Sequence, residues 1–490
     1  MRIVGNNPQL SRQTQATASG AITGGKPVIV NTDGTVTEIA GSATSVGTSV
    51  VFETGVTEAL GIAATFDSNS NRIVIAYQDG GNSNYGTAIV GTIDSSDNSI
   101  SFGTAVVYHS ANSNYNTASF DSNSNKVVIA FTAPADGTGK SYVGTVDPSD
   151  NSISFGSAVN FQAGARASHV SSAFDSNSNK VAIFYEDNGN SNYGTGIVGT
   201  VSGTSISYGS EAVFESAQVS AISATFDSSN NKVVIAYRDH GNSNYGTAVI
   251  GTISSTSISF GTPVVFESAT TTGCSATFDT NSNKVFIAYD DHGATTQNAI
   301  IGTVSGTSIS FGTAVAYETG VSTGNVLATG FDSSTNKVVV GYGDAGDSNK
   351  GKISVGSISG TSVSFETPVE FDAGATVPGY CEIPFDSSTN RLLLPYKDNN
   401  NSQYGTGIVI QTSATNLTSS ENFIGFAEDT VATGQPVTIN TKGAIDENQS
   451  SLTPAQQYFV QTDGTLGTSA DDPSVVAGTA VTATKLIVKG

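Results

Sequence analysis

The sequence is poor in basic residues. Of its 490 residues only 19 are Lys or Arg, against 41 Asp and Glu, so the formal net charge is −22. Seven of the basic residues occupy one repeated place along the chain: Arg72, Lys126, Lys180, Lys232, Lys284, Lys337 and Arg391. Because no basic patch remains to neutralise phosphates, the composition argues against nucleic-acid binding and against adhesion to an anionic lipid surface.

Long apolar runs and cysteines are scarce as well. No segment reaches the roughly 18 to 20 apolar residues of a membrane-spanning helix, so we expect no membrane insertion. The start of the chain, Met1 to Asn7, lacks the apolar stretch of a secretory signal. Cys274 and Cys381 each lie four residues before a repeated Phe, on repeats separated by another repeat. A disulfide needs a Cα spacing of about 4.4 to 6.8 Å, so we interpret both as small buried residues.

Helical periodicity is absent, whereas a repeat of about fifty residues is evident. Each copy passes through Phe-Asp-Ser or Phe-Asp-Thr, beginning at Phe66, Phe120, Phe174, Phe226, Phe278, Phe331 and Phe385. Each copy holds four short runs of β-branched and aromatic residues bounded by Asp, Asn, Ser and Gly, which is typical of strands with tight turns. Because repeats of this length bury their apolar faces by stacking on their neighbours, four strands per copy predict one propeller blade.

The two ends of the repeat region predict a closed ring. The seventh copy has a second strand at 391–396 and a third at 404–411, but lacks the Ser-Ile-Ser-Phe-Gly-Thr segment of the other copies. A matching segment, Ser45 to Glu53, precedes the first copy. If that segment completes the last blade, no strand edge stays exposed. The sequence therefore predicts an all-β chain with a seven-bladed β-propeller over 43–413, closed by an N-terminal strand in the last blade.

The residues outside the ring, 1–42 and 414–490, must leave the last blade side by side. We expect them to form one small β module built from both termini. Internal similarity supports this expectation, because Gly25 to Gly34 is echoed by Gly434 to Gly443. Both segments have the pattern of a strand followed by a tight turn.

Two patterns resemble metal sites. The turns at 67–71 and 121–125 carry oxygen-bearing residues at alternate positions, as calcium loops do, but lack the required glycine and glutamate. We interpret them as Asx turns with an Asp-to-Lys contact. The Asp-His-Gly segments at 239–241 and 291–293 lie on adjacent copies, but the sequence offers no closing ligand, so solvated loop histidines are the simpler interpretation. We predict neither a metal nor a cofactor.

The loops on one face of the predicted ring vary between copies. Turns between first and second strands, and between third and fourth strands, are short and nearly uniform, whereas loops such as 79–85 and 133–139 differ. Variation on a rigid frame is where binding residues concentrate. The candidate ligand-binding residues are amides and tyrosines suited to sugars: Asn82, Asn84, Tyr85, Asn190, Tyr193, Asn242, Tyr245 and Tyr404. The alternative is that these tyrosines open the third strand and pack between blades.

The C-terminal residues carry a resemblance to a known family. The segments concerned are Phe423 to Ala427, Gly434 to Val437, Ser451 to Pro454, Tyr458 to Gly464 and Val475 to Val488. Together they resemble a β module common at the C-terminus of tailed-bacteriophage virion proteins. The Asn6-Asn7-Pro8-Gln9-Leu10 start and the Phe-Asp-Ser repeats are similar to propeller-bearing structural proteins of marine phages and cyanophages. Ala455 departs from the pattern, since related modules tend to have glycine there.

This resemblance implies a non-enzymatic virion structural protein, such as a tail fibre or appendage. Its terminal module would bind other virion proteins, and its propeller would contact a glycan or receptor on the host surface. Such a protein is made in the host cytoplasm and released by lysis, and cyclic symmetry favours a homo-oligomer, most simply a trimer.

Two alternative functions stay open. One is a purely architectural head fibre, decoration or tail-assembly protein. The other is a glycan-hydrolysing propeller enzyme, which requires paired carboxylates at the mouth of the channel. The nearest candidates for such pairs are Glu186 with Asp187 and Asp290 with Asp291.

Overall fold

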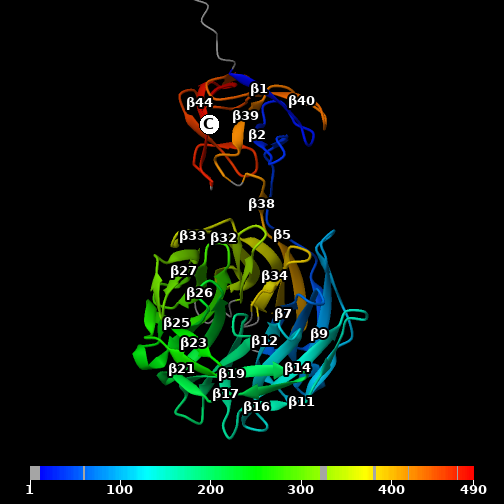
Figure 1. The fold of residues 1–490 in the computed structure, drawn as a ribbon, viewed down its shortest axis with the longest axis vertical. Coiled ribbons are helices and arrows are strands. Elements are labelled where there is room, and N and C mark those ends of the chain that lie inside the picture. The colour runs from blue at the N-terminus through cyan, green and yellow to red at the C-terminus, as the bar shows by residue number, and fades with distance from the viewer. Residues whose placement is uncertain are drawn as a thin grey trace, which may run out of the picture. The chain divides into compact units, whose positions relative to one another are not determined.

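The computed structural model describes residues 12–58, 61–319, 328–378, 382–417, 419–471 and 473–489. Their regular structure is strand, apart from the short 3-10 turns η2 (Gly80–Asn82), η3 (His240–Asn242) and η4 (Ala345–Asp347). Within these ranges no helix is long and apolar enough to cross a membrane. The chain divides into two compact units, one of residues 1–43 and 413–490 and one of residues 44–412 (Figure 1). The predicted boundaries lie one residue away from these.

Each Phe-Asp copy of the 44–412 unit opens the same antiparallel series. In the fourth copy β21 (Ala212–Asp227) pairs with β22 (Lys232–Asp239), β22 with β23 (Tyr245–Ser254), and β23 with β24 (Ser257–Phe260). The other inner strands are β7 (Ala63–Asp67), β12 (Asn114–Asp121), β17 (Ala167–Asp175), β25 (Val264–Asp279), β30 (Ala328–Asp332) and β35 (Phe385–Asp386). The all-β, propeller-type prediction is confirmed, whereas the number of blades rests on the seven repeats of the sequence.

The remaining strands follow the same order in each copy. The second strands are β8 (Arg72–Asp79), β13 (Lys126–Ala133), β18 (Lys180–Asp187), β26 (Lys284–Asp291), β31 (Lys337–Asp344) and β36 (Arg391–Asp398). The third strands are β9 (Tyr85–Asp94), β14 (Thr138–Asp147), β19 (Tyr193–Ser202), β27 (Thr296–Ser305), β32 (Lys350–Ser359) and β37 (Tyr404–Gln411). The outer strands are β10 (Ser99–Phe102), β11 (Val106–Asn112), β15 (Ser152–Phe155), β16 (Val159–Gln162), β20 (Ser205–Tyr208), β28 (Ser308–Phe311), β29 (Val315–Thr319), β33 (Ser362–Phe365) and β34 (Val369–Pro378).

The outer strand of each copy is interrupted near a glycine. In the fourth copy β24 pairs with one end of β23, and the start of β25 pairs with its other end. Gly261 lies at the interruption and donates its N–H to the carbonyl of Ile250 at 2.9 Å. A Cβ at Gly261 would lie 1.8 Å from the carbonyl oxygen of Thr307 in the next copy. The close approach of two backbones therefore requires glycine at this place.

The N-terminal segment completes the last copy, as the sequence predicts. Strands β5 (Ser45–Val46) and β6 (Val50–Val56) both pair with β37. Arg391 donates from Nε to Oδ1 of Asn98 in the first copy at 2.5 Å, and Arg72 makes the same contact with Asn151 in the second copy at 2.6 Å. The first and last copies are thus joined by the same bond that joins the first two.

Buried aromatic side chains fill the space between neighbouring copies. Tyr237 is fully buried on β22, and its ring packs against Phe214 of the third copy at 5.2 Å between centroids. Its hydroxyl donates to Oε2 of Glu215 at 3.0 Å, so the one polar atom of the ring is satisfied. Rings of this size bury large apolar areas, so they contribute to a rigid frame that carries the loops of one face.

The signature aspartates cap turns. Oδ1 of Asp67 accepts from the backbone N–H groups of Asn69 at 2.9 Å and Ser70 at 3.1 Å, which confirms the predicted Asx turn. The expected contact between this Asp and the following basic residue is wrong in the described part of the chain. Arg72 instead donates to the Pro148 carbonyl and to the next copy's Asn151, because the carboxylate is already turned toward the backbone.

The second unit combines both termini, as predicted. One sheet has the order β1 (Gln13–Thr17), β40 (Pro436–Asn440), β39 (Phe423–Ala427), β2 (Pro27–Val30) and β3 (Val36–Glu38). The other has the order β41 (Ile445–Asp446), β45 (Lys485–Val488), β44 (Val475–Thr482), β42 (Gln457–Val460) and β43 (Leu466–Gly467). Strand β4 (Gly41–Ser42) pairs with β38 (Ala414–Thr415).

The structure bears on Ala455 and on one of the two cysteines. Ala455 adopts a left-handed backbone with φ of 66°, a conformation that glycine adopts at lower cost, so the glycine expected there from the resemblance would suit this turn. Cys274 is buried as a free thiol, in agreement with its interpretation, whereas Cys381 lies outside the described residues.

Candidate ligand-binding site

At the end of each second strand, one position carries a different residue type in each copy, while the positions before and after it are nearly constant. An aromatic residue precedes it and, in all copies but one, an aspartate follows it. The residue between them changes from copy to copy: Gln78, Thr132, Glu186, Arg238, Asp290, Gly343 and Lys397. Because the neighbouring residues fix the backbone, the side chain at this position can differ between copies while the strand conformation stays the same. All of these residues lie toward the loops that connect second and third strands, which we call the loop face.

The constant aspartates shape those loops. Oδ1 of Asp79 accepts from the N–H of Asn82 at 2.9 Å, and Oδ1 of Asp239 accepts from Asn242 at 3.1 Å. Ser83 and Asn84 then take left-handed backbone conformations. The predicted amides Asn82, Asn84, Asn190 and Asn242 are exposed as a result.

The predicted tyrosines begin the third strands. Tyr85, Tyr193, Tyr245 and Tyr404 are the first residues of β9, β19, β23 and β37, and all four are half-buried. Their place at the strand start confirms one part of the alternative interpretation, and sugar binding stays a prediction. The structure does not bring all four together, since they belong to the first, third, fourth and seventh copies.

A group of side chains meets between the second, third and fourth copies. We call it the mouth cluster. Its contacts are made by Tyr115, His169, Glu186 and Gln218, and the charges of Arg166, Arg238 and His240 act on it. At its centre Nε2 of His169 lies 3.8 Å from Oε2 of Glu186, and Gln218 donates from Nε2 to Oε1 of Glu186 at 3.3 Å. The rings of Tyr115 and His169 lie 4.8 Å apart between centroids. Three copies therefore contribute to one polar site.

Hydrogen bonds from the fourth copy fix the orientation of the two histidines. The N–H of Ala221 donates to Nδ1 of His169 at 3.4 Å, which leaves the Nε2 hydrogen directed toward Glu186. His240 contacts the hydroxyl of Ser220 through Nε2 at 2.8 Å. Arg238 donates from Nε to Oδ1 of Asn244 at 3.2 Å.

Burial controls the charge of the cluster. It lowers the pKa of His169 to about 4, and the charges of His240 and Arg238 act in the same direction. It raises the pKa of Glu186, against the opposing effects of Gln218 and Arg166. His169 is consequently neutral at neutral pH, and its contact with Glu186 is not an ion pair.

The backbone of the cluster is strained. Tyr115, His169 and Ala221 occupy equivalent places, five residues before the signature Phe, and have φ values of 51°, 51° and 48°. Each lies in a β-bulge between the inner and second strands. A left-handed conformation is costly for a residue with a bulky side chain, and residues of this kind cluster at functional sites.

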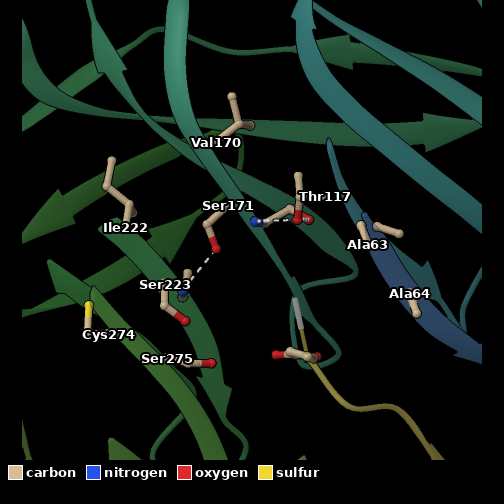
Figure 2. A pocket seen from close by; sticks show the side chains of 13 residues that line it. Ala63, Ala64, Thr117, Val170, Ser171, Ile222, Ser223, Cys274 and Ser275 are labelled. Atoms are coloured by element: carbon tan, nitrogen blue, oxygen red, sulfur yellow. Dashed lines mark hydrogen bonds between the residues drawn. The ribbon is translucent and has the colours of Figure 1, made fainter. Parts of the chain in front are cut away.

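The inner strands line a pocket with small side chains (Figure 2). Ser171 and Thr117 accept hydrogen bonds from the N–H groups of Ala224 and Ser172 at 3.0 and 3.1 Å, which ties neighbouring copies together. The seventh copy places Glu382 where the other copies have Ala63, Thr117, Ser171, Ser223, Ser275 and Ala328. Glu382 is exposed to this pocket, yet protein surrounds it, and this enclosure raises the pKa of its carboxyl to about 7.

The carboxylates considered for hydrolysis do not form facing pairs. Glu186 belongs to the mouth cluster, whereas Asp187 accepts from Gln162 and from the N–H of Gly189, both at 2.9 Å. Asp291 likewise caps its loop by accepting from Gly293 and Ala294, while its neighbour Asp290 is buried beside Thr272. Adjacent strand residues point to opposite faces, so each supposed pair is divided.

The histidines considered for a metal do not share a site. His240 contacts Ser220, whereas the backbone N–H of His292 donates to the carbonyl of Thr270 in β25 at 2.9 Å. Within the described ranges no group of three or more His, Cys, Asp and Glu residues could hold a metal ion.

Sequence reasoning missed most of the mouth cluster. Arg238 could have been found from the sequence, because it occupies the position between an aromatic residue and an aspartate that differs from copy to copy. Tyr115 and His169 gave no such signal, because their approach depends on bulges that the sequence pattern does not mark.

No family model and no curated protein matches the sequence. Solved structures with similar folds include the NanB sialidase from Streptococcus pneumoniae, with 8% identity and a TM-score of 0.43 over 81% of this chain and 99% of that one. Sqt1 from Saccharomyces cerevisiae shares 12% identity, with a TM-score of 0.43 over 73% of this chain and 84% of that one. AofleA from Arthrobotrys oligospora shares 9% identity, with a TM-score of 0.40 over 71% and 98%.

Proposed function

We propose that this protein is a non-enzymatic recognition protein of a bacteriophage virion, and that the loop face of its propeller-type unit contacts a glycan on the host surface. The supporting observation is the variable residue at the end of each second strand, held between a buried aromatic and a loop-capping aspartate. An architectural frame needs no such variation, whereas a recognition surface gains selectivity from it.

The chain connections are consistent with an attachment on the other face. Ser45 pairs with Gln411, so the chain enters and leaves the 44–412 unit at the end opposite to the loop face. The loop face is therefore free of chain connections to the terminal module. The resemblance of that module to phage virion modules supports a role in binding other virion proteins, in a homo-oligomer for which a trimer is the simplest form.

The division of the candidate carboxylate pairs supports binding over hydrolysis. A glycosidase needs two carboxyl groups on either side of one bond. Asp187 and Asp291 are instead engaged in capping loops. Polysaccharide cleavage that is lost in a Glu186→Gln variant would contradict this part of the proposal.

Binding of labelled protein to a panel of marine bacterial and cyanobacterial strains tests the proposal. Tyr245→Ala and Asn242→Ala on the loop face should weaken cell binding, while Lys232→Gln at the opposite end of the same copy should not. The melting temperature of each variant shows whether the fold is intact. If the native protein stains no strain, the architectural alternative is favoured, in which the propeller contacts other virion proteins in a head fibre, decoration or tail assembly.

A further inference from the structure

The pocket between the inner strands brings together residues that lie far apart in the sequence. Six copies of the repeat contribute to it, five through their inner strands and the seventh through Glu382. The cavity has a volume of about 30 Å³, and a single water needs about 10 to 15 Å³ on the same measure. A ligand group of two or three non-hydrogen atoms therefore fits without movement of the walls.

Glu382 brings a carboxylate into this pocket without a protein partner. Within the described part of the chain, the carboxylate makes no hydrogen bond and no ion pair, and enclosure by protein is the one cause that raises its pKa. In the other copies the same place holds Ala, Ser or Thr. Because an enclosed carboxylate is costly to ionise without a compensating partner, the pocket favours a positively charged ligand.

Two serine hydroxyls of neighbouring copies line the same pocket. Ser171 accepts from the N–H of Ala224 at 3.0 Å, and Ser223 accepts from the N–H of Ala276 at 2.9 Å, so both oxygens are held in place. The structure records no further hydrogen bond of either hydroxyl among the described residues. Each oxygen can therefore accept one more bond from a donor in the pocket (Figure 2).

Apolar side chains form much of the remaining wall. Val170 and Ile222 line the pocket together with Ala64, Ala118 and Ala224. A divalent metal ion needs six or more oxygen ligands, and such a wall does not supply them. An alkyl group, by contrast, is stabilised by contact with these side chains. The wall therefore favours an organic cation over an inorganic one.

We propose that this pocket binds a small alkylamine in its protonated form. The ammonium group pairs with the carboxylate of Glu382, and the hydroxyl oxygens of Ser171 and Ser223 offer acceptors for its remaining hydrogens. The alkyl group packs against Val170 and Ile222. This inference goes beyond the proposed function, because recognition through the loop face uses none of these residues.

Calorimetric titration of the full chain with ethylamine at pH 8 tests the inference. Ethanol is one matched ligand, since it keeps the ethyl group and loses the charge. Ammonium chloride is the other, since it keeps the charge and loses the ethyl group. We expect ethylamine to bind at least tenfold more tightly than either. Equal binding of ethanol or of ammonium, or no binding of ethylamine at millimolar concentration, would overturn the inference.

Matched variants assign the binding to the pocket. Glu382→Gln removes the charge and keeps the size of the side chain, and it should weaken ethylamine binding at least tenfold. Glu370→Gln is the control, since it removes the same charge from the outer strand β34, where Glu370 pairs with Lys350 at 3.2 Å. It should change binding less than twofold. Equal losses in both variants would show nonspecific attraction of a cation to an acidic chain and contradict the inference.

The pH dependence of binding provides a readout that a purely structural role of Glu382 would not change. Among the residues that line the pocket the titratable ones are Glu382 and Cys274, and burial raises the pKa of the Cys274 thiol, so it stays neutral. The pKa of Glu382 is about 7, whereas an alkylamine, like a lysine side chain, has a pKa of about 10.4 and stays protonated. Ethylamine binding should therefore tighten about tenfold from pH 6 to pH 8 in the native protein and stay constant in Glu382→Gln. Equal binding by the native protein at both pH values would overturn the inference.

Discussion

The hydroxyl of Thr44 donates to Oε2 of Glu366 at 2.9 Å, and Glu366 stands where the other copies have a glycine at the interruption of the outer strand. Six copies have glycine at the interruption of the outer strand: Gly47, Gly103, Gly156, Gly209, Gly261 and Gly312. A Cβ at these glycines would lie 1.8 to 2.1 Å from a carbonyl oxygen in the turn of the next copy. Glu366 faces the seventh copy, where the chain leaves and that turn does not exist. The glycine is therefore replaced only in the copy where no neighbouring carbonyl oxygen would collide with a Cβ.

Substitution of these glycines should lower the free energy of unfolding, because an added Cβ would collide with the neighbouring carbonyl oxygen. Gly261→Ala forces two backbones apart, and we expect it to destabilise the fold by about 2 kcal/mol, the usual cost of overpacking. Glu366→Gly should cost less, because it removes a hydroxyl contact and the partly exposed ion pair with Lys337 at 3.0 Å. Calorimetric unfolding compares the two variants. Equal destabilisation would contradict the explanation of the repeat.

The bond between Arg391 and Asn98 should contribute to ring closure. A double-mutant cycle with Arg391→Ala and Asn98→Ala should give a coupling of about 1 kcal/mol or more, as for a charged hydrogen bond. The equivalent cycle on Arg72 and Asn151 in the first two copies is the control, since its geometry matches. Coupling in the control cycle and none between the first and last copies would show that the ring is open.

Glu382 should make the stability of the protein depend on pH. The pKa of its carboxyl is raised in the folded state to about 7 from an ordinary 4.5, so the unfolded chain loses its proton first as the pH rises. Its contribution to stability is present below about pH 4.5 and is lost as the pH rises to about 7. Glu382→Gln should therefore stabilise the fold at pH 8 by about 1 kcal/mol, a value reduced because solvent reaches the group.

Thermal unfolding of Glu382→Gln at pH 4 and pH 8 provides the measurement. The variant and the native protein should melt together at pH 4 and differ at pH 8. A native protein that is the more stable of the two at pH 8 would show that the ionised carboxylate has a stabilising partner.

His169 should make the stability of the protein depend on pH in the opposite direction to Glu382. The pKa of its ring is lowered in the folded state to about 4 from an ordinary 6.5, so the unfolded chain takes up the proton first as the pH falls. Stability contributed by the neutral ring is present above about pH 6.5 and is lost toward pH 4. The groups that face the ring are Tyr115, Glu186, Arg238 and His240.

Comparison with His169→Asn isolates this effect. Between pH 7 and pH 5 the melting temperature of the native protein should fall by several degrees more than that of the variant, since Asn does not titrate. Parallel curves for both proteins would show that His169 is free to take up a proton in the folded state.

The repeat made the strand order predictable, because Phe-Asp turns and β-branched runs depend on local chemistry. The completion of the last copy by Ser45 and its neighbours was also predictable, since a missing segment and a surplus one match. The contacts of the basic residues were not predicted. Arg72 and Arg391 each precede a copy whose turn contains Asn151 or Asn98, but this relation appears only when neighbouring copies are placed side by side.

The mouth cluster was harder to predict than the fold. Its members come from three copies and meet because bulges turn Tyr115 and His169 out of the regular alternation of the strand. Sequence periodicity assigns side chains to faces only while that alternation holds. The tyrosines at the strand starts were accessible to sequence reasoning because the loops before them repeat.

Binding of the labelled full chain to an array of bacterial surface polysaccharides tests the central claim most directly. We predict selective binding to a small set of polysaccharides, lost in a variant carrying Arg238→Gln and Tyr245→Ala on the loop face. A variant carrying Lys232→Gln at the opposite end of the same copy should bind as the native protein does. Absence of binding to every polysaccharide, or equal loss in both variants, would contradict recognition through the loop face.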